Sequence, residues 1–519
     1  MITQMSIVKL IIKMKGLKVM TYNLINGNDF NANEQIETKY LIVGSGAGGA
    51  VASYLLNKHD HNTLVIEEGN ISEHKDAPEL SSNLSKWRNS GIIPIFAGSN
   101  IISYAEGSCV GGSTEINGAL MWRTPDKILD EWRSKYELED LSPKIMSKYF
   151  EEYENRMSIG YQDEEGSNNS SKKLLEIATN LKWSTERVKR AQKGCKNTNQ
   201  CPVGCPSGGK QSMSRTYIQD YLKGNGKLIY NTKVYQILFE KNLAKKVLVR
   251  STNGKKFYIN FQHIFIASGV IQTPLLLLKS GIGKNVGNNF QIQPNLKIAV
   301  LFDKNIEPQK GTMMTRQINE FSKDGFSIGS SNFSPTYLSM TIASTGQKAL
   351  EFLNNWKKTS LYISLMKFNG KGKIRYVPFT NIPLLNYKIL SSDFEIMKKS
   401  ILKMAEGFFS AGAKKIVTPF RKFQIISSIN ELKEKLMKEE NLKNVELSAV
   451  HGMSTCGMSG NPNKFRSATG NYGQLHDFKN IYITDASILP TSLGVNPQQS
   501  ISSLVMRNVD HFLNSKKII

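Results

Sequence analysis

The stretch that decides the fold is KYLIVGSGAGG, residues Lys39 to Gly49. A short apolar strand runs directly into Gly44, Gly46 and Gly49, and the chain continues from Ala50 to Leu56 with helical character. In such a strand–turn–helix unit the first glycine permits the turn, the second lets the backbone approach a pyrophosphate, and the third lets the helix pack against the strand. The helix N-terminus then faces the phosphates with its positive dipole end. The stretch therefore predicts a Rossmann-like dinucleotide site.

A second strand supports this interpretation. The short run from Thr63 to Ile66 ends in Glu67, at about the twenty-residue distance expected for the carboxylate that binds the adenosine ribose hydroxyls. An acidic side chain at this position would repel the ribose phosphate of NADP. The alternative is a structural glycine turn followed by an unrelated surface glutamate.

A second glycine-rich loop, EGSCVGGSTEIN, follows at Glu106 to Asn117 and runs into GALMWRTP at Gly118 to Pro125. Glycine leaves room for a ligand, so the backbone N–H groups of such a loop can lie close to a phosphate or a flavin ring. Taken alone, the loop is equally consistent with a long surface connection.

Five segments occur in order along the chain: GSGAGGAVAS from Gly44, GSCVGGSTEINGALMWRTP from Gly107, ASGVIQTPLLLLKSGIG from Ala267, HGMSTCGMS from His451 and YITDASILPTSLGVNPQQSI from Tyr482. Together they resemble the ordered motifs of the glucose-methanol-choline (GMC) oxidoreductase family. The forms HGMSTC and GVNP are most similar to the branch that includes long-chain alcohol oxidases and bacterial sugar and polyol dehydrogenases. The resemblance implies FAD as the cofactor and oxidation of an alcohol group by hydride transfer to the flavin.

The resemblance also implies an α/β fold with two domains. A Rossmann-like FAD-binding domain with a parallel sheet is expected at residues 37–125, 195–294 and 445–512. An α+β substrate-binding domain with an antiparallel sheet is expected at residues 126–194 and 295–444.

Two strand-like stretches, Ser360 to Phe368 and Lys373 to Pro378, predict part of that antiparallel sheet. The segment from Asp393 to Phe409 predicts a helix with one apolar side, on which Met397 and Met404 are expected in the core.

The residues that contact FAD are also implied by the resemblance. Val234 matches a position where a strand packs by the adenine, Ala267 borders the dinucleotide, and Asp485 lies by the ribityl or pyrophosphate region. A helix that begins at Gln498 would direct its N-terminus at the pyrimidine end of the flavin and favour the anionic reduced form. The full predicted set is Gly44, Gly46, Gly49, Glu67, Gly111, Gly112, Ser113, Asn117, Val234, Ala267, Asp485, Asn496, Pro497 and Gln498.

Chemistry at the alcohol requires a base, because an alcohol loses a hydride readily only if its hydroxyl proton leaves at about the same time. Histidine suits this role because its ordinary pKa lies near neutrality. An isolated histidine is more often a hydrogen-bonded structural residue, but His451 matches the catalytic histidine of the family motif. The companion position falls on Asn496, whose amide can hydrogen-bond the alcohol oxygen and cannot take up a proton at pH 7. We therefore predict His451 as the base and Asn496 as the group that stabilises the developing alkoxide.

One departure from the family pattern lies near this site. The family often has His-Pro where this chain has Gln293 and Pro294. The departure predicts altered surroundings of the flavin and not a loss of activity.

Three cysteines, Cys195, Cys201 and Cys205, lie in the loop GCKNTNQCPVGCPSGGK with metal-ligand spacing. Thiolates in a loop rich in Gly and Pro are typical of iron–sulfur clusters and of structural zinc. Three ligands fit a 3Fe-4S cluster better than a closed zinc site, and membrane-associated sugar dehydrogenases of the resembled family carry a similar loop. Such a cluster would relay electrons to a cytochrome or quinone. The alternative is a loop that covers the FAD, with the cysteines as small packing residues.

Composition limits the partners and the location. The 519 residues include 67 Lys and Arg against 43 Asp and Glu, a net charge of +24. No basic arm or nucleic-acid motif accompanies this charge, so we expect a solvated surface without nucleic acid, and peripheral membrane contact is the alternative. Five cysteines do not form a disulfide scaffold and favour the cytoplasm. No apolar run in residues 1–36 reaches the ~18 residues of a membrane span, so we expect an N-terminal tail there; a weak amphipathic contact and a mis-called start before Met14 or Met20 are the alternatives.

The sequence therefore predicts an FAD-dependent dehydrogenase that acts on a sugar, a polyol or another alcohol. An oxygen-using long-chain alcohol oxidase is the first alternative, and a non-redox flavin-binding protein or lyase is the second. No charged constellation in the inserted segments indicates the substrate.

Overall fold

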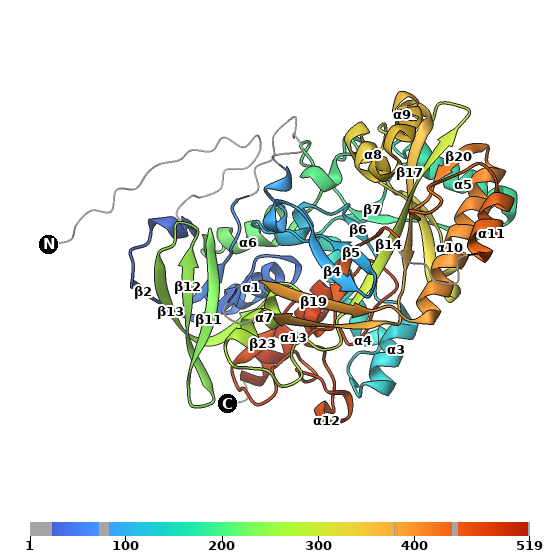
Figure 1. Cartoon of the computed structure of the whole chain (residues 1–519). Coiled ribbons are helices and arrows are strands. Elements are labelled where there is room, and N and C mark those ends of the chain that lie inside the picture. Colours follow the sequence, from blue (N-terminus) through green and yellow to red (C-terminus); the bar gives the residue numbers. More distant parts are fainter. Residues whose placement is uncertain (1–22, 72–82, 378–379, 381, 439–444, 517–519) are drawn as a thin grey trace.

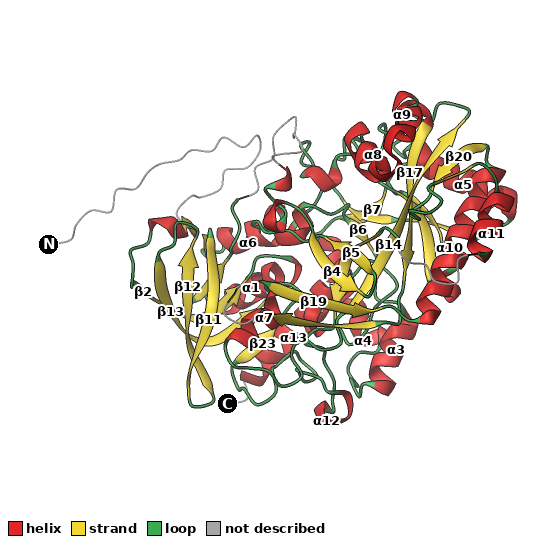
Figure 2. Cartoon of the chain, viewed as in Figure 1, coloured by secondary structure: helices red, strands yellow, loops and turns green. Residues whose placement is uncertain are grey.

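The computed structural model describes residues 23–71, 83–377, 380, 382–438 and 445–516. Most of the predicted N-terminal tail, residues 1–22, lies outside the described residues. Two large sheets dominate the fold, one on the left and one on the right of Figure 1. Figure 2 shows helices packed along both of them.

The first sheet has eight strands and carries the predicted dinucleotide loop. Its strands are β1 (Leu24–Asn26), β10 (Lys227–Tyr230), β3 (Thr63–Ile66), β2 (Gln35–Val43), β13 (Lys256–Ile266), β12 (Leu243–Ser251) and β11 (Thr232–Glu240) in spatial order, with β23 (Ile481–Ile483) beside β13. The pairs from β1 to β13 are parallel, and β12 and β11 extend the sheet in antiparallel fashion. Strand β2 has neighbours on both sides, which explains why its end is a continuous apolar run.

Strand β1 lies inside the segment that was expected to be a tail. It pairs in parallel with β10 at the edge of the sheet. Residues 24–26, and residues 35 and 36 at the start of β2, are thus strands of the first sheet, and a three-residue edge strand leaves too short a pattern to recognise in the sequence.

The second sheet has twelve strands and is largely antiparallel. In spatial order its strands are β18 (Lys371–Tyr376), β19 (Pro383–Lys388), β4 (Ile93–Ala97), β5 (Asn100–Tyr104), β22 (Leu447–Met453), β14 (Gln291–Phe302), β17 (Thr359–Met366), β16 (Phe326–Ser330), β15 (Arg316–Ile318) and β8 (Thr185–Arg187), with β20 (Ala413–Val417) and β21 (Ile425–Ile426) off this path. A small third sheet contains β6 (Leu120–Met121), β9 (Lys189–Ala191) and β7 (Ile159–Tyr161). The two strands predicted around residues 360 and 373 correspond to β17 and β18, although Pro378 lies outside the described residues.

The second sheet crosses the predicted domain boundaries. Strands β4, β5 and β22 lie in segments expected to bind FAD, yet they pair within the sheet that contains β14 and β17. The division into domains remains a prediction. For the site, this crossing means that β14 and β22 are paired strands, and both contribute residues to the cavity described below.

Helices cover both sheets. They are α1 (Ala47–His59), α3 (Asp126–Lys135), α4 (Pro143–Arg156), α5 (Asn169–Leu181), α6 (Tyr217–Lys223), α7 (Gln272–Lys279), α8 (Pro335–Ile342), α9 (Ala349–Asn354), α10 (Ser391–Ser410), α11 (Ile429–Met437), α12 (Pro462–Phe465) and α13 (Gln498–Lys516). Helix α10 confirms the predicted helix, and Met397 and Met404 are fully buried in the core, as expected. Among the described helices, none is long and apolar enough to cross a membrane.

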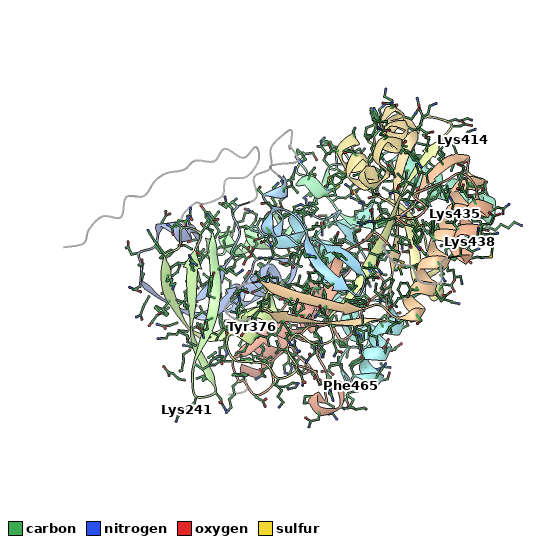
Figure 3. All side chains as sticks on the ribbon, in the orientation of Figure 1. Lys241, Tyr376, Lys414, Lys435, Lys438 and Phe465 are labelled. Atoms are coloured by element: carbon green, nitrogen blue, oxygen red, sulfur yellow. The ribbon has the colours of Figure 1, made fainter. Side chains whose placement is uncertain are left out.

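The positive charge is spread over the surface. Figure 3 shows Lys241, Lys414 and Lys438 projecting outward from separate parts of the chain, and all three are exposed. This distribution agrees with a solvated surface.

Candidate active site

The glycines of the first loop have different neighbours. Gly44 has a φ of +102°, and a Cβ there would lie 2.3 Å from the carbonyl oxygen of Ala267. A Cβ on Gly49 would lie 2.0 Å from the carbonyl oxygen of Gly44. These two glycines permit close packing of the chain on itself. At Gly46, which caps α1, a Cβ would meet only the Cα of Gly112, 3.9 Å away. Gly46 therefore leaves open space at the positive end of the helix.

That space belongs to a cavity of about 440 Å³ that reaches from the glycine loop to the face of the second sheet. The predicted residues that line it are Gly44, Gly46, Glu67, Gly112, Ser113, Asn117, Val234, Ala267, His451, Asp485, Asn496, Pro497 and Gln498. Gly49 and Gly111 are not among the lining residues. Instead, the Gly111 N–H donates to Oγ of Ser45 at 3.0 Å, so this glycine joins the two loops. One cavity thus brings together residues from four distant segments of the chain.

Glu67, predicted to bind ribose hydroxyls, is 5% exposed and holds the loop itself. Its Oε2 accepts hydrogen bonds from the backbone N–H and the hydroxyl of Ser45 at 3.0 and 2.7 Å, and Oε1 accepts from the Gly69 N–H at 2.9 Å. A carboxylate offers about four lone-pair sites, so acceptor capacity remains for a ligand hydroxyl. The pKa of Glu67 is raised, because burial raises it more than these hydrogen bonds lower it.

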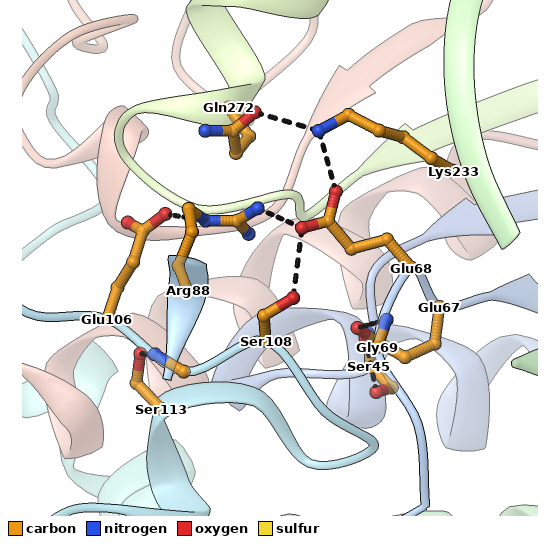
Figure 4. A network of polar contacts seen from close by, with 11 residues as sticks. Ser45, Glu67, Glu68, Gly69, Arg88, Glu106, Ser108, Ser113, Lys233 and Gln272 are labelled. Carbon is orange, nitrogen blue, oxygen red and sulfur yellow. Dashed lines mark hydrogen bonds and ion pairs between the residues drawn. The ribbon is translucent and has the colours of Figure 1, made fainter. Parts of the chain in front are cut away.

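A polar network that we did not predict lies beside Glu67 and also lines the cavity (Figure 4). Arg88 bridges the carboxylates of Glu68 and Glu106, and Lys233 binds the second oxygen of Glu68 at 3.0 Å. Burial alone would raise the pKa of Glu68, but the charges of Arg88 and Lys233 hold it at about 2. Lys233 also contacts Oε1 of Gln272 at 3.4 Å. The adjacent acid pair at positions 67 and 68 was the only local signal for this network.

Strand β22 presents His451 to the cavity. Burial lowers the pKa of His451 to about 4. The imidazole is therefore neutral at pH 7 and can accept a proton. Asn496 lines the same cavity, is half-buried, and has no hydrogen-bond partner for its side chain within the described parts of the chain. Its amide is free to bind a ligand.

Gln293 joins these two residues. Its Oε1 accepts hydrogen bonds from the N–H groups of Leu493 and Gly494 at 3.2 and 3.1 Å. Its Nε2 donates to the carbonyl oxygen of Val495 at 2.9 Å and lies 3.4 Å from Nδ1 of His451. The side chain of Gln293 is fully buried. The departure from the family pattern thus bridges the histidine and the loop that leads into Asn496.

Two further contacts hold the C-terminal motif in place beside the second glycine-rich loop and the end of β13. The side chain of Asn117 donates to Oε1 of Gln498 at 2.6 Å, at the start of α13. Asp485 accepts hydrogen bonds from the Gly269 N–H at 2.9 Å and from the Ser487 N–H at 2.8 Å. Asp485 therefore caps the short helix that follows it and also holds the residues after β13 at the cavity.

The three cysteines do not fit the predicted cluster. Sγ of Cys201 accepts a hydrogen bond from Arg190 at 3.2 Å, Sγ of Cys205 accepts one from the Lys210 N–H at 3.2 Å, and Sγ of Cys195 lies 3.5 Å from Oγ1 of Thr312. Within the described ranges, no group of three or more His, Cys, Asp or Glu side chains is arranged to hold a metal ion. Burial raises the pKa of Cys201, which opposes the thiolate form that a metal requires. Separate partners for the thiols agree with the packing alternative.

Comparison with known proteins gives consistent matches along the chain. Two family models described as GMC oxidoreductase match residues 38–295 and 371–504. GMC-type oxidoreductase y4nJ of Sinorhizobium fredii is 29% identical over 490 residues, which cover 93% of this chain and 95% of that protein. Long-chain-alcohol oxidase FAO4A of Arabidopsis thaliana is 25% identical, over 93% of this chain and 70% of that protein.

Two solved structures share the fold. Pyridoxine 4-oxidase from Mesorbium loti superposes with a TM-score of 0.70 at 13% identity, over 92% of this chain and 99% of that one. Formate oxidase superposes with a TM-score of 0.67 at 13% identity, over 94% of this chain and 100% of that one. These likenesses support the predicted combination of a Rossmann-like domain with a second, antiparallel sheet.

Proposed function

This chain belongs to the GMC oxidoreductase family and is an FAD-dependent oxidoreductase, and from that premise we propose that it oxidises an alcohol with His451 as the base. The observation that carries the proposal is the cavity that His451 and Asn496 share with the glycine loop. Family membership favours this function over a non-redox flavin protein or a lyase.

The cavity fits FAD by the chemistry of its walls. Gly46 leaves backbone exposed where a Cβ would fill the space, as close approach to a pyrophosphate requires, and Gly112 lets the second loop pack against Gly46, because a Cβ on Gly112 would lie 2.9 Å from the Cα of Gly46. Glu67 retains acceptor capacity for a ribose hydroxyl, and Asp485 and the start of α13 border the other end. When bound, FAD would supply the acceptor for the hydride.

In the proposed reaction His451 takes the hydroxyl proton on an imidazole nitrogen. Its lowered pKa ensures that the neutral form is present before substrate binds. The amide of Asn496 donates a hydrogen bond to the same oxygen and stabilises negative charge as the C–H bond breaks. The hydride leaves the carbon, the proton stays on His451, and the product is a carbonyl.

The electron acceptor distinguishes two candidate functions. The predicted dehydrogenase would pass electrons to a cytochrome or quinone, and no step of this proposal uses a cluster. The oxygen-using oxidase is the second candidate, because relatives such as the Arabidopsis protein are named alcohol oxidases.

An absorption spectrum of anaerobically purified protein, with iron analysis of the same sample, tests the cofactor content. We expect the flavin bands without stoichiometric iron, because the three thiols have separate partners. Stoichiometric iron that is lost in a Cys201→Ser variant would contradict this. Reoxidation of the alcohol-reduced enzyme by oxygen or by a quinone analogue, followed in a stopped-flow instrument, then identifies the acceptor. Protein purified without flavin, and unable to bind added FAD, would contradict the proposed function.

Replacement of Gln293 by leucine should lower stability by roughly 2–4 kcal/mol, because two N–H groups and one carbonyl lose a buried partner. Flavin reduction by alcohol should also slow, since the residues before Asn496 lose their anchor. Thermal unfolding and anaerobic reduction kinetics measure the two effects. Gln309→Leu, at another amide side chain outside the cavity, is the matched control. An unchanged rate in Gln293→Leu would show that Gln293 has no positioning role.

A further inference from the structure

Lys297 occupies an unusual position on β14, the central strand beside β22. Gln293, Asn295 and Lys297 are every second residue of this strand, so their side chains point to the same face. Gln293 contacts His451, whereas Asn295 and Lys297 line the cavity farther along the strand. Among the described residues of the second sheet that line the cavity, Lys297 is therefore the one with a positively charged side chain.

The ammonium group of Lys297 stands apart from the other polar groups that the structure describes. Within the described parts of the chain, no hydrogen bond and no ion pair reaches it. Burial lowers its pKa, and no neighbouring charge contributes to that shift. An isolated buried cation costs several kcal/mol unless something pairs with it. The cavity is the place from which such a partner can come.

Among the described residues, those that adjoin Lys297 across the sheet are uncharged. Lys297 pairs with Ile363, Ile363 with Gly329, and Gly329 with Gln317 across four antiparallel strands, and all four residues line the cavity. Gln317 donates to the carboxylate of Glu186, which also accepts from the indole of Trp122. That carboxylate is thus satisfied within the wall and does not neutralise the lysine.

We propose that Lys297 binds an anionic group of the substrate, so that the alcohol oxidised here carries a carboxylate or a phosphate. This inference rests on the proposed function, because it takes the hydroxyl to lie at His451. An ammonium is a compact charge with three donors, and it pairs with either anion through charge-assisted hydrogen bonds. Neutral alcohols would leave the charge of Lys297 unpaired and would bind more weakly.

The strand also indicates how far Lys297 lies from the residues around His451. Lys297 lies four positions after Gln293, which corresponds to about 13 Å between their Cα atoms along an extended strand. Since Gln293 contacts His451, the oxidised carbon and the anion should be several bonds apart. The apolar side chains of Ile363 and Leu365 line the wall of the same cavity and suit an intervening carbon chain.

The test uses the FAD-loaded enzyme and two matched series. Anaerobic flavin reduction is measured with ω-hydroxy acids from 4-hydroxybutanoate to 12-hydroxydodecanoate, each beside the primary alkanol of equal chain length. Glycerol 3-phosphate beside glycerol distinguishes a phosphate from a carboxylate. Binding of hexanoate, which has no hydroxyl to oxidise, is measured separately by calorimetry. The variants are Lys297→Met and Lys297→Arg, with Lys373→Met, at an exposed lysine of the same sheet, as control.

We expect the anionic member of a pair to be preferred by about ten-fold to one-hundred-fold in kcat/KM, the range of a charge-assisted hydrogen bond. Lys297→Met should abolish both the preference and hexanoate binding, Lys297→Arg should retain them, and Lys373→Met should behave like the wild type. Equal rates for anionic and neutral alcohols in the wild type, or a preference that survives in Lys297→Met, would overturn the inference. If no alcohol of either kind reduces the flavin, the proposed function fails instead, and hexanoate binding still reports on Lys297.

Discussion

The His451→Gln variant is expected to reduce its flavin with alcohol about 100-fold to 10,000-fold more slowly than the wild type, the range of general base catalysis. Glutamine can still hydrogen-bond the alcohol oxygen, but it cannot accept the proton. The hydride would then have to leave an alcohol that keeps its hydroxyl proton. Bleaching of the flavin absorption in anaerobic stopped-flow experiments measures the effect.

The control for this variant is His476→Gln, which changes a partly buried histidine outside the cavity. Its reduction rate should match the wild type. Both variants should retain FAD and unfold near the wild-type temperature, since the one side-chain hydrogen bond of His451 within the described residues is the 3.4 Å contact with Gln293. An undiminished rate in His451→Gln, with FAD bound, would show that another group acts as the base.

The pH dependence follows from the same residue. Burial lowers the pKa of His451 to about 4, so the basic form is present at all pH values well above 4. The rate of flavin reduction should be level from neutral pH down to about pH 5 and then fall as the imidazole gains a proton. A midpoint near the ordinary histidine pKa of about 6.5 would contradict a buried neutral base.

A Gly46→Val variant is expected to fold and to lose FAD. A Cβ at this position meets nothing closer than the Cα of Gly112 at 3.9 Å, and the φ of −72° is ordinary for any residue. The new side chain would project into the cavity at the N-terminus of α1, where the backbone must approach the pyrophosphate. We expect the affinity for FAD to fall about 100-fold or more, as the loss of close phosphate contacts implies.

The measurement is the ratio of flavin to protein absorbance after purification, followed by titration with FAD and thermal unfolding. Gly160→Val is the matched control, because a Cβ there meets nothing within 4 Å and the residue lies in the small third sheet. It should bind FAD normally. Gly44→Val would not serve, since its Cβ would clash with the carbonyl of Ala267 and unfold the loop. Full flavin occupancy in Gly46→Val would show that the pyrophosphate does not bind beside residue 46.

The sequence by itself determined the glycine loop with the strands and the helix around it, and most of the residues predicted for the site line the cavity. The signal is local there: an apolar strand, a glycine spacing and an acid after the next strand are all short-range patterns, and β2, α1 and β3 follow them. His451 and Asn496 were predicted from motifs, and both line the cavity. For the cysteine loop the same local evidence left a cluster and simple packing both open, because spacing along a chain does not set which groups the sulfur atoms contact.

Only the tertiary structure decided which distant side chains meet. Gln293 bridges His451 and Val495 because β14 pairs with β22, and Arg88 joins Glu68 to Glu106 although no local pattern relates them. Lys297 is one lysine among many in the sequence, and it becomes distinctive because its strand face borders the cavity and no acid of the described residues pairs with it. Such contacts depend on strand pairing, which brings distant side chains together only after the chain has folded. They also depend on burial, which lowers the dielectric around a charge and so makes its partners matter more.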